Sequence, residues 1–260
     1  MPTALITGAS SGIGLELASL AARDRHDLVL VSRNRERLES VGRGLADQYG
    51  VKVSIVAKDL ADPSSAAELE ADLSGRGIAV DVLVNNAGFG VYGFFAETPI
   101  QDEMAMIEVN VSAVTRLTKV FLRGMLERRR GWILNVASTA AFQPGPIMAV
   151  YYATKAYVLS FSEALASETE GTGVTVTTLC PGTTRTEFQK RAGFKPVPLL
   201  RSPFMSGSAG EVARAGWEGM KDGKRLVVPG LFNKVAVQAE RVTPRRLVTA
   251  LVKRLQQSRS

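Results

Sequence analysis

A tyrosine and a lysine stand four residues apart in the segment Tyr-Tyr-Ala-Thr-Lys, which places Tyr151 and Lys155 on one face of a helix. A free tyrosine has a pKa near 10 and is therefore a poor proton donor or acceptor at neutral pH. An ammonium about 5 Å away, at an effective dielectric of about 20, favours the phenolate by roughly 3 kcal/mol. That shift brings the tyrosine towards the range in which general acid–base catalysis is efficient. The alternative is an ordinary helix with a packed tyrosine and an exposed lysine.

A second chemical signal is a glycine-rich segment near the N-terminus. A β-prone run over residues 3–7 leads into Gly8-Ala9-Ser10-Ser11-Gly12-Ile13-Gly14 and then into a helical pattern. Such a turn binds anions, because unpaired backbone amides and the helix dipole point at a phosphate. The spacing Gly-x-x-x-Gly-x-Gly differs from the Gly-x-Gly-x-x-Gly of the standard dinucleotide fingerprint. The flanking strand and helix favour a nucleotide-binding site over a glycine-rich loop that binds no ligand.

Several motifs, taken together, resemble the short-chain dehydrogenases/reductases, a family with a single Rossmann-like domain. They follow the order and the spacings of that family, from the first predicted strand to about residue 230. They are Thr7-Gly8-Ala9-Ser10-Ser11-Gly12-Ile13-Gly14, Asn85-Asn86-Ala87-Gly88, Asn110, Ser138, Tyr151 with Lys155, and Pro181-Gly182. Independent motifs in one register leave little room for coincidence.

The resemblance implies a role for each candidate catalytic residue. Tyr151 is expected to donate a proton when a carbonyl is reduced and to accept one when an alcohol is oxidised. Ser138 is expected to hydrogen-bond the substrate oxygen and to stabilise the charge that develops during hydride transfer. Lys155 is expected to lower the tyrosine pKa and to hold the nicotinamide ribose. Asn110, inside a predicted long helix, is expected to keep a water in the proton relay.

The resemblance also implies a nicotinamide dinucleotide cofactor. Ser32 occupies the position of the acidic residue that holds the ribose 2′-hydroxyl in NAD-binding folds, and Arg33 follows at once. A guanidinium offers a 2′-phosphate a bidentate contact, so we predict NADP(H). The alternative for Arg33 is a solvated arginine at a helix start, a description that Arg35 and Arg37 fit equally well. The other expected cofactor contacts are Gly8, Ser10, Ser11, Gly12, Ile13, Gly14, Asp59 (alternatively a helix cap near Pro63), Leu60, Asn86, Ala87, Gly88, Tyr151, Lys155, Pro181, Gly182, Thr183 and Thr186.

Short apolar runs alternate with helical patterns along the chain, as is typical of parallel strands buried on both faces. We predict a single-domain α/β fold with a doubly wound, mostly parallel, seven-stranded Rossmann-like sheet and helices on both faces. The motifs follow strand ends, so they converge on one edge of this sheet. The expected strands are 4–6, 28–31, 53–57, 82–84, 133–136, 174–179 and 226–228, and the expected helices are 13–22, 35–48, 64–73, about 101–128, 149–170 and 210–220.

We expect residues 1–230 to form the NADP-binding catalytic domain, with 185–207 as a substrate flap within it and 231–260 as a basic amphipathic extension. Apolar residues in the flap and the aromatics Phe89, Tyr92, Phe94 and Phe95 suggest a hydrophobic substrate. Alternatively, these side chains anchor their loops on the core. From Pro244 onwards apolar residues of the extension recur at helical spacing, which predicts a short basic amphipathic helix. This helix docks on its own domain or a partner subunit, or it makes a weak peripheral contact with an anionic membrane through 241–260.

Bulk composition excludes several classes of function. Six basic residues and no acidic one follow residue 240, so the first 240 residues carry only +1 of the net charge of +7. A uniformly basic nucleic-acid-binding surface is therefore not expected. One histidine (His26) and one cysteine (Cys180) leave no ligand set for a metal and no triad for a hydrolase. The lone cysteine and the absence of an apolar run of about 18 residues predict a soluble, cytoplasmic protein.

The sequence thus predicts an NADP(H)-dependent oxidoreductase that acts on a small carbonyl or alcohol molecule. A homodimer or homotetramer paired through residues 101–128 and 149–170 is implied by the resemblance. The main alternative is a non-catalytic NADP(H)-binding regulatory or scaffold protein, which has no need of the acid–base pair. An isomerase or epimerase is a second alternative, but such relatives usually have a larger substrate domain.

Overall fold

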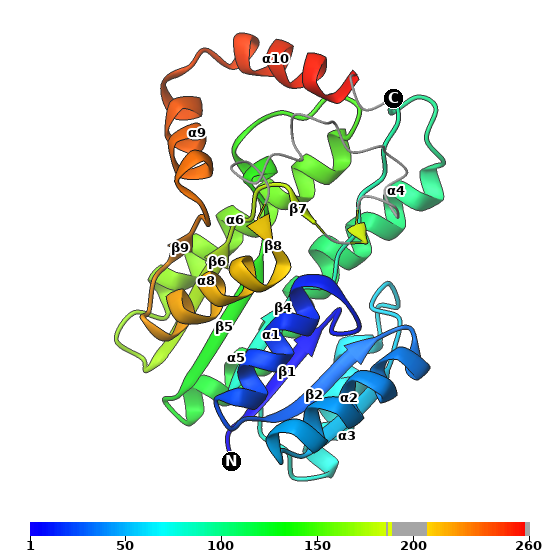
Figure 1. Cartoon of the computed structure of the whole chain (residues 1–260), viewed down its shortest axis with the longest axis vertical. Helices are drawn as coiled ribbons and strands as arrows, with labels where there is room; N and C mark the ends of the chain where they lie inside the picture. The colour runs from blue at the N-terminus through cyan, green and yellow to red at the C-terminus, as the bar shows by residue number, and fades with distance from the viewer. Residues whose placement is uncertain (186, 189–206, 258–260) are drawn as a thin grey trace.

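The computed structural model describes residues 1–185, 187–188 and 207–257 of the chain. Within these residues, seven parallel strands form one central sheet with helices on both faces (Figure 1). This arrangement confirms the predicted Rossmann-like fold. From one edge to the other the strands are β3 (Val53–Ala57), β2 (Asp27–Ser32), β1 (Thr3–Thr7), β4 (Val82–Asn85), β5 (Gly131–Val136), β6 (Val174–Leu179) and β9 (Leu226–Val227).

The two faces of the sheet are apolar because successive side chains of a strand point in opposite directions. Ala4 and Ile6 of β1 belong to one cluster of buried side chains, whereas Leu5 between them belongs to another. Burial of both faces explains why the strands read as continuous apolar runs. The first cluster includes side chains of α1 (Gly12–Arg23), α2 (Arg35–Tyr49) and α8 (Ala209–Lys221), and the second includes side chains of α3 (Ser65–Gly75), α5 (Val114–Glu127) and α6 (Ala149–Glu168).

The strand order changes direction between β1 and β4. The chain builds the sheet outward from β1 to β3 and then returns to place β4 on the other side of β1. Open α/β sheets bind ligands beyond the strand ends at such a switch point. The loops after β1 and β4 meet there, since the backbone amides of Asn86 and Ala87 donate to Thr7 Oγ1 at 2.9 and 3.0 Å.

A chain of buried polar side chains ties the central strands to the helices behind them. Asn85 Nδ2 donates to Thr118 Oγ1 of α5 at 3.0 Å and to Asn135 Oδ1 of β5 at 2.8 Å. Asn135 Nδ2 in turn donates to Ser162 Oγ of α6 at 2.9 Å. Hydrogen bonds inside the low-dielectric core favour one arrangement of the elements that carry them. The network therefore holds α6, the helix of the candidate tyrosine and lysine, in register with β5.

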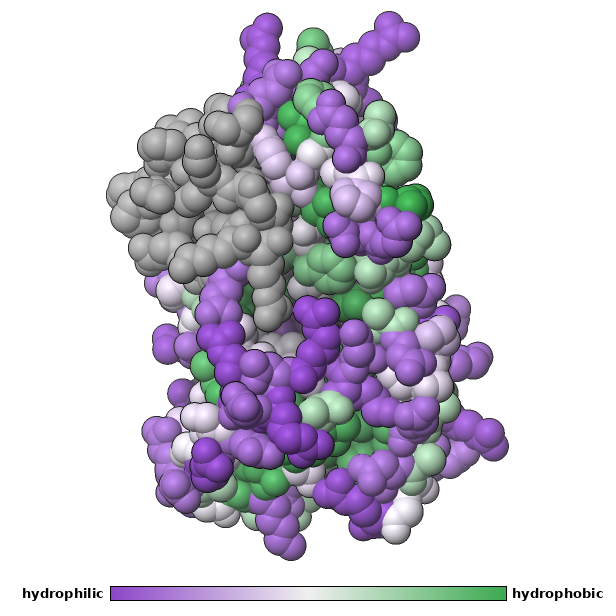
Figure 2. Space-filling model, turned by 90° about the vertical axis from the view of Figure 1, so that its right-hand side faces the viewer, coloured by the Kyte–Doolittle hydropathy of each residue, from purple (hydrophilic) through white to green (hydrophobic). Residues whose placement is uncertain are grey.

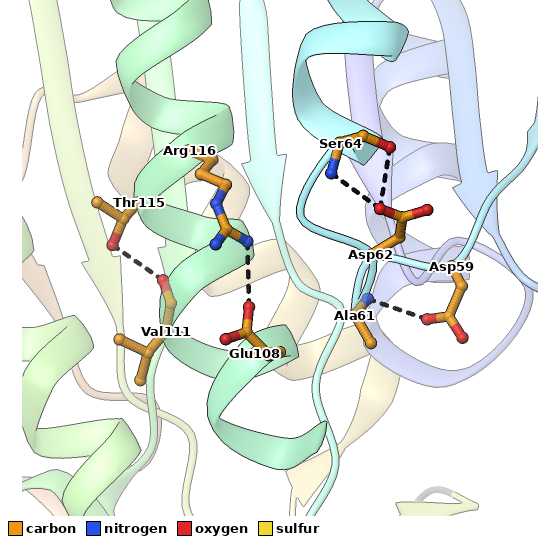
Figure 3. Close-up of polar contacts among 8 residues, drawn as sticks. All are labelled: Asp59, Ala61, Asp62, Ser64, Glu108, Val111, Thr115 and Arg116. Carbon is orange, nitrogen blue, oxygen red and sulfur yellow. Dashed lines mark hydrogen bonds and ion pairs between the residues drawn. The ribbon is translucent and has the colours of Figure 1, made fainter. Parts of the chain in front are cut away.

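The single long helix predicted over residues 101–128 is interrupted. It consists of α4 (Ile100–Ile107), a π-helical segment (Glu108–Ala113) and α5. An ion pair of 3.1 Å between Arg116 and Glu108 and a hydrogen bond of 2.9 Å from Thr115 Oγ1 to Val111 O span the junction with α5 (Figure 3). Such π-helical turns frequently mark functional sites, and Asn110 lies in this one.

Two helices lie beyond the end of the sheet at which the strands end (Figure 1). They are α9 (Leu231–Val242), which the sequence did not predict, and α10 (Arg245–Gln257), which the apolar recurrence after Pro244 predicted. A short 3₁₀ helix (Thr139–Phe142) follows β5, and β7 (Thr184–Arg185) pairs with β8 (Gly207–Ser208). Most of the predicted flap, residues 185–207, lies outside the described residues.

None of the described helices has the length and apolar character that a membrane span requires. Exposed hydrophobic side chains nevertheless gather at one end of the molecule, and Figure 2 shows them in the upper part of one face above a mostly hydrophilic lower part. Among the described residues, eleven of the fourteen large exposed hydrophobic side chains lie in or just before α4, in α9 or in α10. They are Phe94, Phe95, Ile100, Met104, Leu231, Phe232, Val235, Val242, Leu247, Leu251 and Leu255.

Candidate active site

The turn between β1 and α1 is tight because two of its glycines lie against each other. Gly8 has a φ of +66°, a left-handed conformation that glycine adopts without strain. A Cβ on Gly14 would lie 2.3 Å from Gly8 O, so a larger residue does not fit there. Asn86 Nδ2 donates to Thr7 O at 2.9 Å and to Gly8 O at 3.3 Å, which holds the turn against the loop after β4. The turn and the N-terminus of α1 form an anion-binding geometry.

A cavity of about 830 Å³ lies along the ends of the strands. Gly14 and Asn110 do not line it, and Thr186 lies outside the described residues. The cavity therefore brings together nearly all the residues that the sequence predicted for the site. Its lining includes Gly8, Ser10, Ser11, Gly12, Ile13, Arg33, Asp59, Leu60, Asn86, Ala87, Gly88, Ser138, Tyr151, Lys155, Pro181, Gly182 and Thr183.

The candidate catalytic side chains meet in one wall of this cavity. Lys155 Nζ lies 5.9 Å from the centre of the Tyr151 ring and donates to Val136 O at 3.0 Å. Ser138, which begins the 3₁₀ helix, accepts a hydrogen bond from the amide of Ala140 at 3.1 Å. Its hydroxyl donates to Pro181 O at 3.4 Å. This distance is long for a hydrogen bond between two oxygens, so a better acceptor can replace Pro181 O.

Burial sets the ionisation of Lys155. The side chain is buried, and desolvation lowers the pKa of Lys155 to about 8. A thiolate at Cys180 would raise it, but burial also raises the pKa of the Cys180 thiol to about 12. At pH 7 the thiol is therefore neutral, whereas the lysine still carries its proton. The wall of the cavity thus holds one positive charge beside the tyrosine.

Asn110 lies behind the cavity and is fully buried in the π-helical segment. Its Nδ2 donates to Phe89 O at 2.9 Å and to Thr154 Oγ1 at 3.1 Å, and its Oδ1 accepts from the amide of Phe89 at 3.1 Å. Thr154 is the neighbour of Lys155 on α6. Asn110 thus fixes both the loop after β4 and the helix of the candidate catalytic pair.

The cavity is also lined by Ser32, the last residue of β2, and by Arg33, which follows it. Ser32 Oγ is shielded from solvent and has no hydrogen-bond partner in the described structure. Arg33 is exposed and makes no hydrogen bond or ion pair within the described residues. Arg37, by contrast, forms two hydrogen bonds to the Glu187 carboxylate, at 2.9 and 2.8 Å, and Arg35 lies 3.7 Å from Glu39.

The loop after β3 is shaped by its own carboxylates (Figure 3). Asp59 Oδ1 accepts from the amide of Ala61 at 3.0 Å, and Asp62 Oδ1 accepts from the amide and the hydroxyl of Ser64, both at 2.9 Å. Asp62 thus closes the turn that leads into Ser64, the N-cap residue of α3, and neither carboxylate caps the helix itself. Asp59 stabilises only its own turn and lines the cavity with Leu60.

The C-terminal helices supply site residues that the sequence did not predict. Tyr92 Oη donates to Gln256 O at 2.6 Å, and Gln256 Nε2 donates to Tyr152 Oη at 2.7 Å, which ties α10 to α6 beside Tyr151. A Cβ on Gly182 would lie 2.5 Å from Asn233 Oδ1, so α9 packs directly on the loop after β6. The recurrence of apolar residues predicted a helix from Pro244 onwards, but no sequence signal connects Gln256 with a tyrosine 104 residues earlier.

The described residues contain no group of three or more histidine, cysteine or carboxylate side chains that could hold a metal ion. His26 is buried next to Trp132 and Trp217, with ring centres 6.4 and 5.5 Å away. Burial lowers the pKa of His26, which keeps the ring neutral at pH 7. This histidine is a packed core residue outside the cavity.

The chain is similar to known proteins of one family. The family model of short chain dehydrogenases matches residues 2–195. A very-long-chain 3-oxoacyl-CoA reductase of Phaeosphaeria nodorum is 36% identical over 219 residues, which cover 82% of this chain. The match covers 64% of that reductase, so the chain spans somewhat less than two thirds of its length.

Two solved structures resemble the chain over most of its length. A short-chain dehydrogenase from Sphingobium yanoikuyae, in complex with NADPH, is 35% identical with a TM-score of 0.83, and the match covers 93% of this chain and 94% of that one. A bulky-bulky ketone specific alcohol dehydrogenase from Comamonas testosteroni is 30% identical with a TM-score of 0.78, with coverage of 93% and 92%.

Proposed function

The chain belongs to the short-chain dehydrogenase family, and from this we propose that it interconverts a carbonyl and an alcohol on a hydrophobic substrate, with NADP(H) as cofactor. The observation that carries the proposal is the meeting of Ser138, Tyr151 and buried Lys155 in the wall of one cavity. The reductase and the ketone-specific dehydrogenase described above support the reaction class. The relative in complex with NADPH supports the cofactor.

The residues present fit this cofactor at both ends of the cavity. The glycine turn presents backbone amides to a pyrophosphate, and Ser32 Oγ and Arg33 are two donors without partners in the described structure, as a 2′-phosphate requires. Lys155 would hold the nicotinamide ribose, and Pro181 and Gly182 would border the nicotinamide. When bound, the cofactor supplies or accepts the hydride.

In this proposal the protein supplies the proton and fixes the substrate oxygen. The oxygen of a bound carbonyl would lie between Ser138 Oγ and the Tyr151 hydroxyl. Ser138 exchanges its long contact with Pro181 O for this oxygen, and Tyr151 donates its proton to it. The ammonium of Lys155, one helical turn away, stabilises the phenolate that remains. Oxidation of an alcohol reverses these steps.

A screen of NADPH oxidation against aldehydes, ketones and acyl carbonyls tests the proposal. We expect turnover with at least one apolar carbonyl, and none with Tyr151→Phe at the same cofactor occupancy. Tight binding of NADPH without turnover of any carbonyl, in wild type as in Tyr151→Phe, would instead identify the non-catalytic alternative.

We further propose that subunits pair through α5 and α6. On α6 the Tyr157 ring is 39% exposed and stacks on Phe161, with ring centres 5.7 Å apart. Its hydroxyl lies 2.8 Å from Thr115 Oγ1 of α5, so α5 and α6 are in direct contact at this exposed position. Tyr157→Glu would then shift the molar mass in light scattering from a dimer or tetramer towards the monomer, and an unchanged mass would remove this interface.

We also propose that the end formed by α9 and α10 contacts a lipid surface. On α10 the exposed side chains Leu247 and Leu251 lie beside exposed Arg245, Arg246 and Arg254. An exposed apolar stripe flanked by basic residues is the pattern of helices that lie on anionic membranes. Leu251 also lines the cavity, so in this proposal an apolar substrate enters from the lipid-facing end.

A further inference from the structure

Two residues that line the cavity each carry a side-chain oxygen that has no hydrogen-bond partner in the described part of the chain. Glu240 of α9 and Gln256 of α10 both line the cavity, and neither takes part in the proposed proton transfer. Glu240 Oε2 and Gln256 Oε1 are shielded from solvent and accept no hydrogen bond in the described structure. Each such oxygen costs free energy, because it loses water without gaining a donor.

The amide of Gln256 is held in place by its other contacts. Its Nε2 donates to Tyr152 Oη at 2.7 Å, and its backbone oxygen accepts from Tyr92 Oη at 2.6 Å. One of the two N–H donors of the side-chain amide is thus used by the protein, and this bond fixes the direction of the amide. The side-chain oxygen remains for a ligand.

The surroundings of Glu240 are apolar. On its own helix Ala236 and Val237 line the same cavity, and Val252 and Leu255 line it from α10. Desolvation raises the pKa of Glu240 to about 7, and no cation in the described structure compensates for it. The Glu240 carboxyl is therefore suited to accept a hydrogen bond from a ligand in a mostly apolar part of the cavity wall.

We propose that Glu240, assisted by Gln256, binds a hydroxyl group on the body of the substrate, away from the reacting carbonyl. The proposal rests on the proposed function and narrows its substrate class to hydrophobic carbonyl compounds that carry a distal hydroxyl. A site built to hydrogen-bond a hydroxyl discriminates against an analogue that lacks it, because the buried acceptors then stay unpaired. Substrate binding would thereby satisfy both oxygens.

Three matched ketones test the proposal: one with a distal hydroxyl, one with hydrogen in its place, and one with a methoxy group that accepts but cannot donate. For the wild type we expect a kcat/KM for the hydroxyl ketone about tenfold or more above the other two. Glu240→Leu should remove this preference through KM while leaving turnover of the plain ketone intact. Glu240→Gln keeps an acceptor and should retain part of the preference.

Gln238→Leu is the matched control, because Gln238 is exposed on the same helix and does not line the cavity. It should leave the preference unchanged. Equal kcat/KM for the three ketones in the wild type, or a preference that survives Glu240→Leu, would overturn the proposal.

A binding measurement separates this proposal from the proposed reaction. Calorimetric titration of the three ketones into Tyr151→Phe protein saturated with NADPH reads the hydroxyl site without turnover. We expect the hydroxyl ketone to bind about tenfold or more tightly than the others, and the difference to vanish in Tyr151→Phe with Glu240→Leu. Equal binding contradicts the hydroxyl site even if turnover occurs. A clear preference supports the site even if turnover fails and the reaction assignment falls.

Discussion

At the scale of single residues, Lys155 combines two opposed requirements. Its charge is needed to stabilise a phenolate at Tyr151, whereas its burial disfavours that charge and lowers the pKa of Lys155 to about 8. Within the described structure its charge is compensated by a hydrogen bond of 3.0 Å to Val136 O and by the Tyr151 ring, whose centre lies 5.9 Å from Nζ. Groups that are poised for catalysis commonly reduce the stability of the fold that holds them.

We expect Lys155→Met to abolish turnover and to stabilise the cofactor-free protein by up to about 3 kcal/mol at pH 7. Between the folded pKa of about 8 and the free value of 10.5, the unfolded wild type binds more protons than the folded one. The free energy of unfolding of the wild type therefore rises with pH through this window, and the advantage of Lys155→Met shrinks there. Urea unfolding at pH 7 and pH 10 measures the free energy of unfolding of the wild type and of Lys155→Met at each pH. A constant difference between the two proteins would show that Lys155 is not buried as a cation.

Arg33 and Arg37 allow a matched test of cofactor choice. Arg33 lines the cavity and has no partner among the described residues, whereas Arg37 is held by Glu187 at 2.8 Å. We expect Arg33→Ala to raise KM for NADPH about tenfold or more relative to KM for NADH, because a charged hydrogen bond to the 2′-phosphate is lost. Arg37→Ala should change the ratio much less. Equal effects of Arg33→Ala on the KM values for NADPH and NADH would show that Arg33 does not bind the 2′-phosphate.

Residue types and spacing were sufficient to predict Ser138, Tyr151 and Lys155 as neighbours. They were sufficient because helix geometry fixes residues four apart, and because parallel strands end at one edge of the sheet. Glu240 and Gln256 were not predictable in the same way. Each is an ordinary polar residue in an amphipathic helix, and only the packing of that helix over the cavity gives it a function.

At the scale of elements, the turn between β1 and α1 depends on close contact between backbone atoms. We expect Gly14→Ala to destabilise the fold by about 1–3 kcal/mol, because the new Cβ would lie 2.3 Å from Gly8 O. The affinity for NADPH should fall as well, since the turn has to open. Thermal unfolding with and without NADPH measures both effects.

Gly44→Ala is the control for this change. Gly44 lies in α2, and a Cβ added there would have no atom within 4 Å, so alanine should stabilise the helix by up to about 1 kcal/mol. Equal behaviour of the two variants would show that the turn tolerates a side chain.

Strands and helices were predictable where they form the sheet, and less so around the site. Buried apolar runs predicted every strand of the main sheet within two residues. The π-helical segment was missed because one inserted residue in a turn hardly alters the apolar pattern of a long helix. α9 was missed because its apolar residues Leu231, Phe232 and Val235 remain exposed, and Val237 is the one described residue of this helix that is buried.

At the scale of the whole molecule, charge and apolar surface are both concentrated at one end. The exposed basic residues Arg245, Arg246, Lys253 and Arg254 lie on α10, and most of the large exposed hydrophobic side chains of the described residues lie at the same end. The cavity is lined there by α9 and α10. This distribution suits a protein that takes an apolar substrate from a surface where such molecules gather. The cytoplasmic location predicted from the sequence stays a prediction.

We expect full-length protein to co-sediment with vesicles of mixed phosphatidylserine and phosphatidylcholine, and to lose this binding with added salt. Arg246→Glu combined with Leu247→Glu should abolish it, because both side chains are exposed on α10. Arg43→Glu on α2 is a control for charge alone and should reduce it only slightly. Vesicle binding that is equal in all three proteins, or absent in the wild type, would contradict the proposed lipid contact.

The central claim is that the Tyr151 phenol, beside the Lys155 ammonium, exchanges a proton with the substrate. Tyr152 is the natural control, since it also lines the cavity but has Ala156 instead of lysine one helical turn on. The most direct measurement is kcat for NADPH-dependent ketone reduction, together with the NADPH dissociation constant, in Tyr151→Phe and Tyr152→Phe. We predict that Tyr151→Phe lowers kcat by about 10²–10⁴-fold with little change in NADPH binding, while Tyr152→Phe keeps most of its activity. Substantial turnover by Tyr151→Phe, or a greater loss in Tyr152→Phe, would contradict the account.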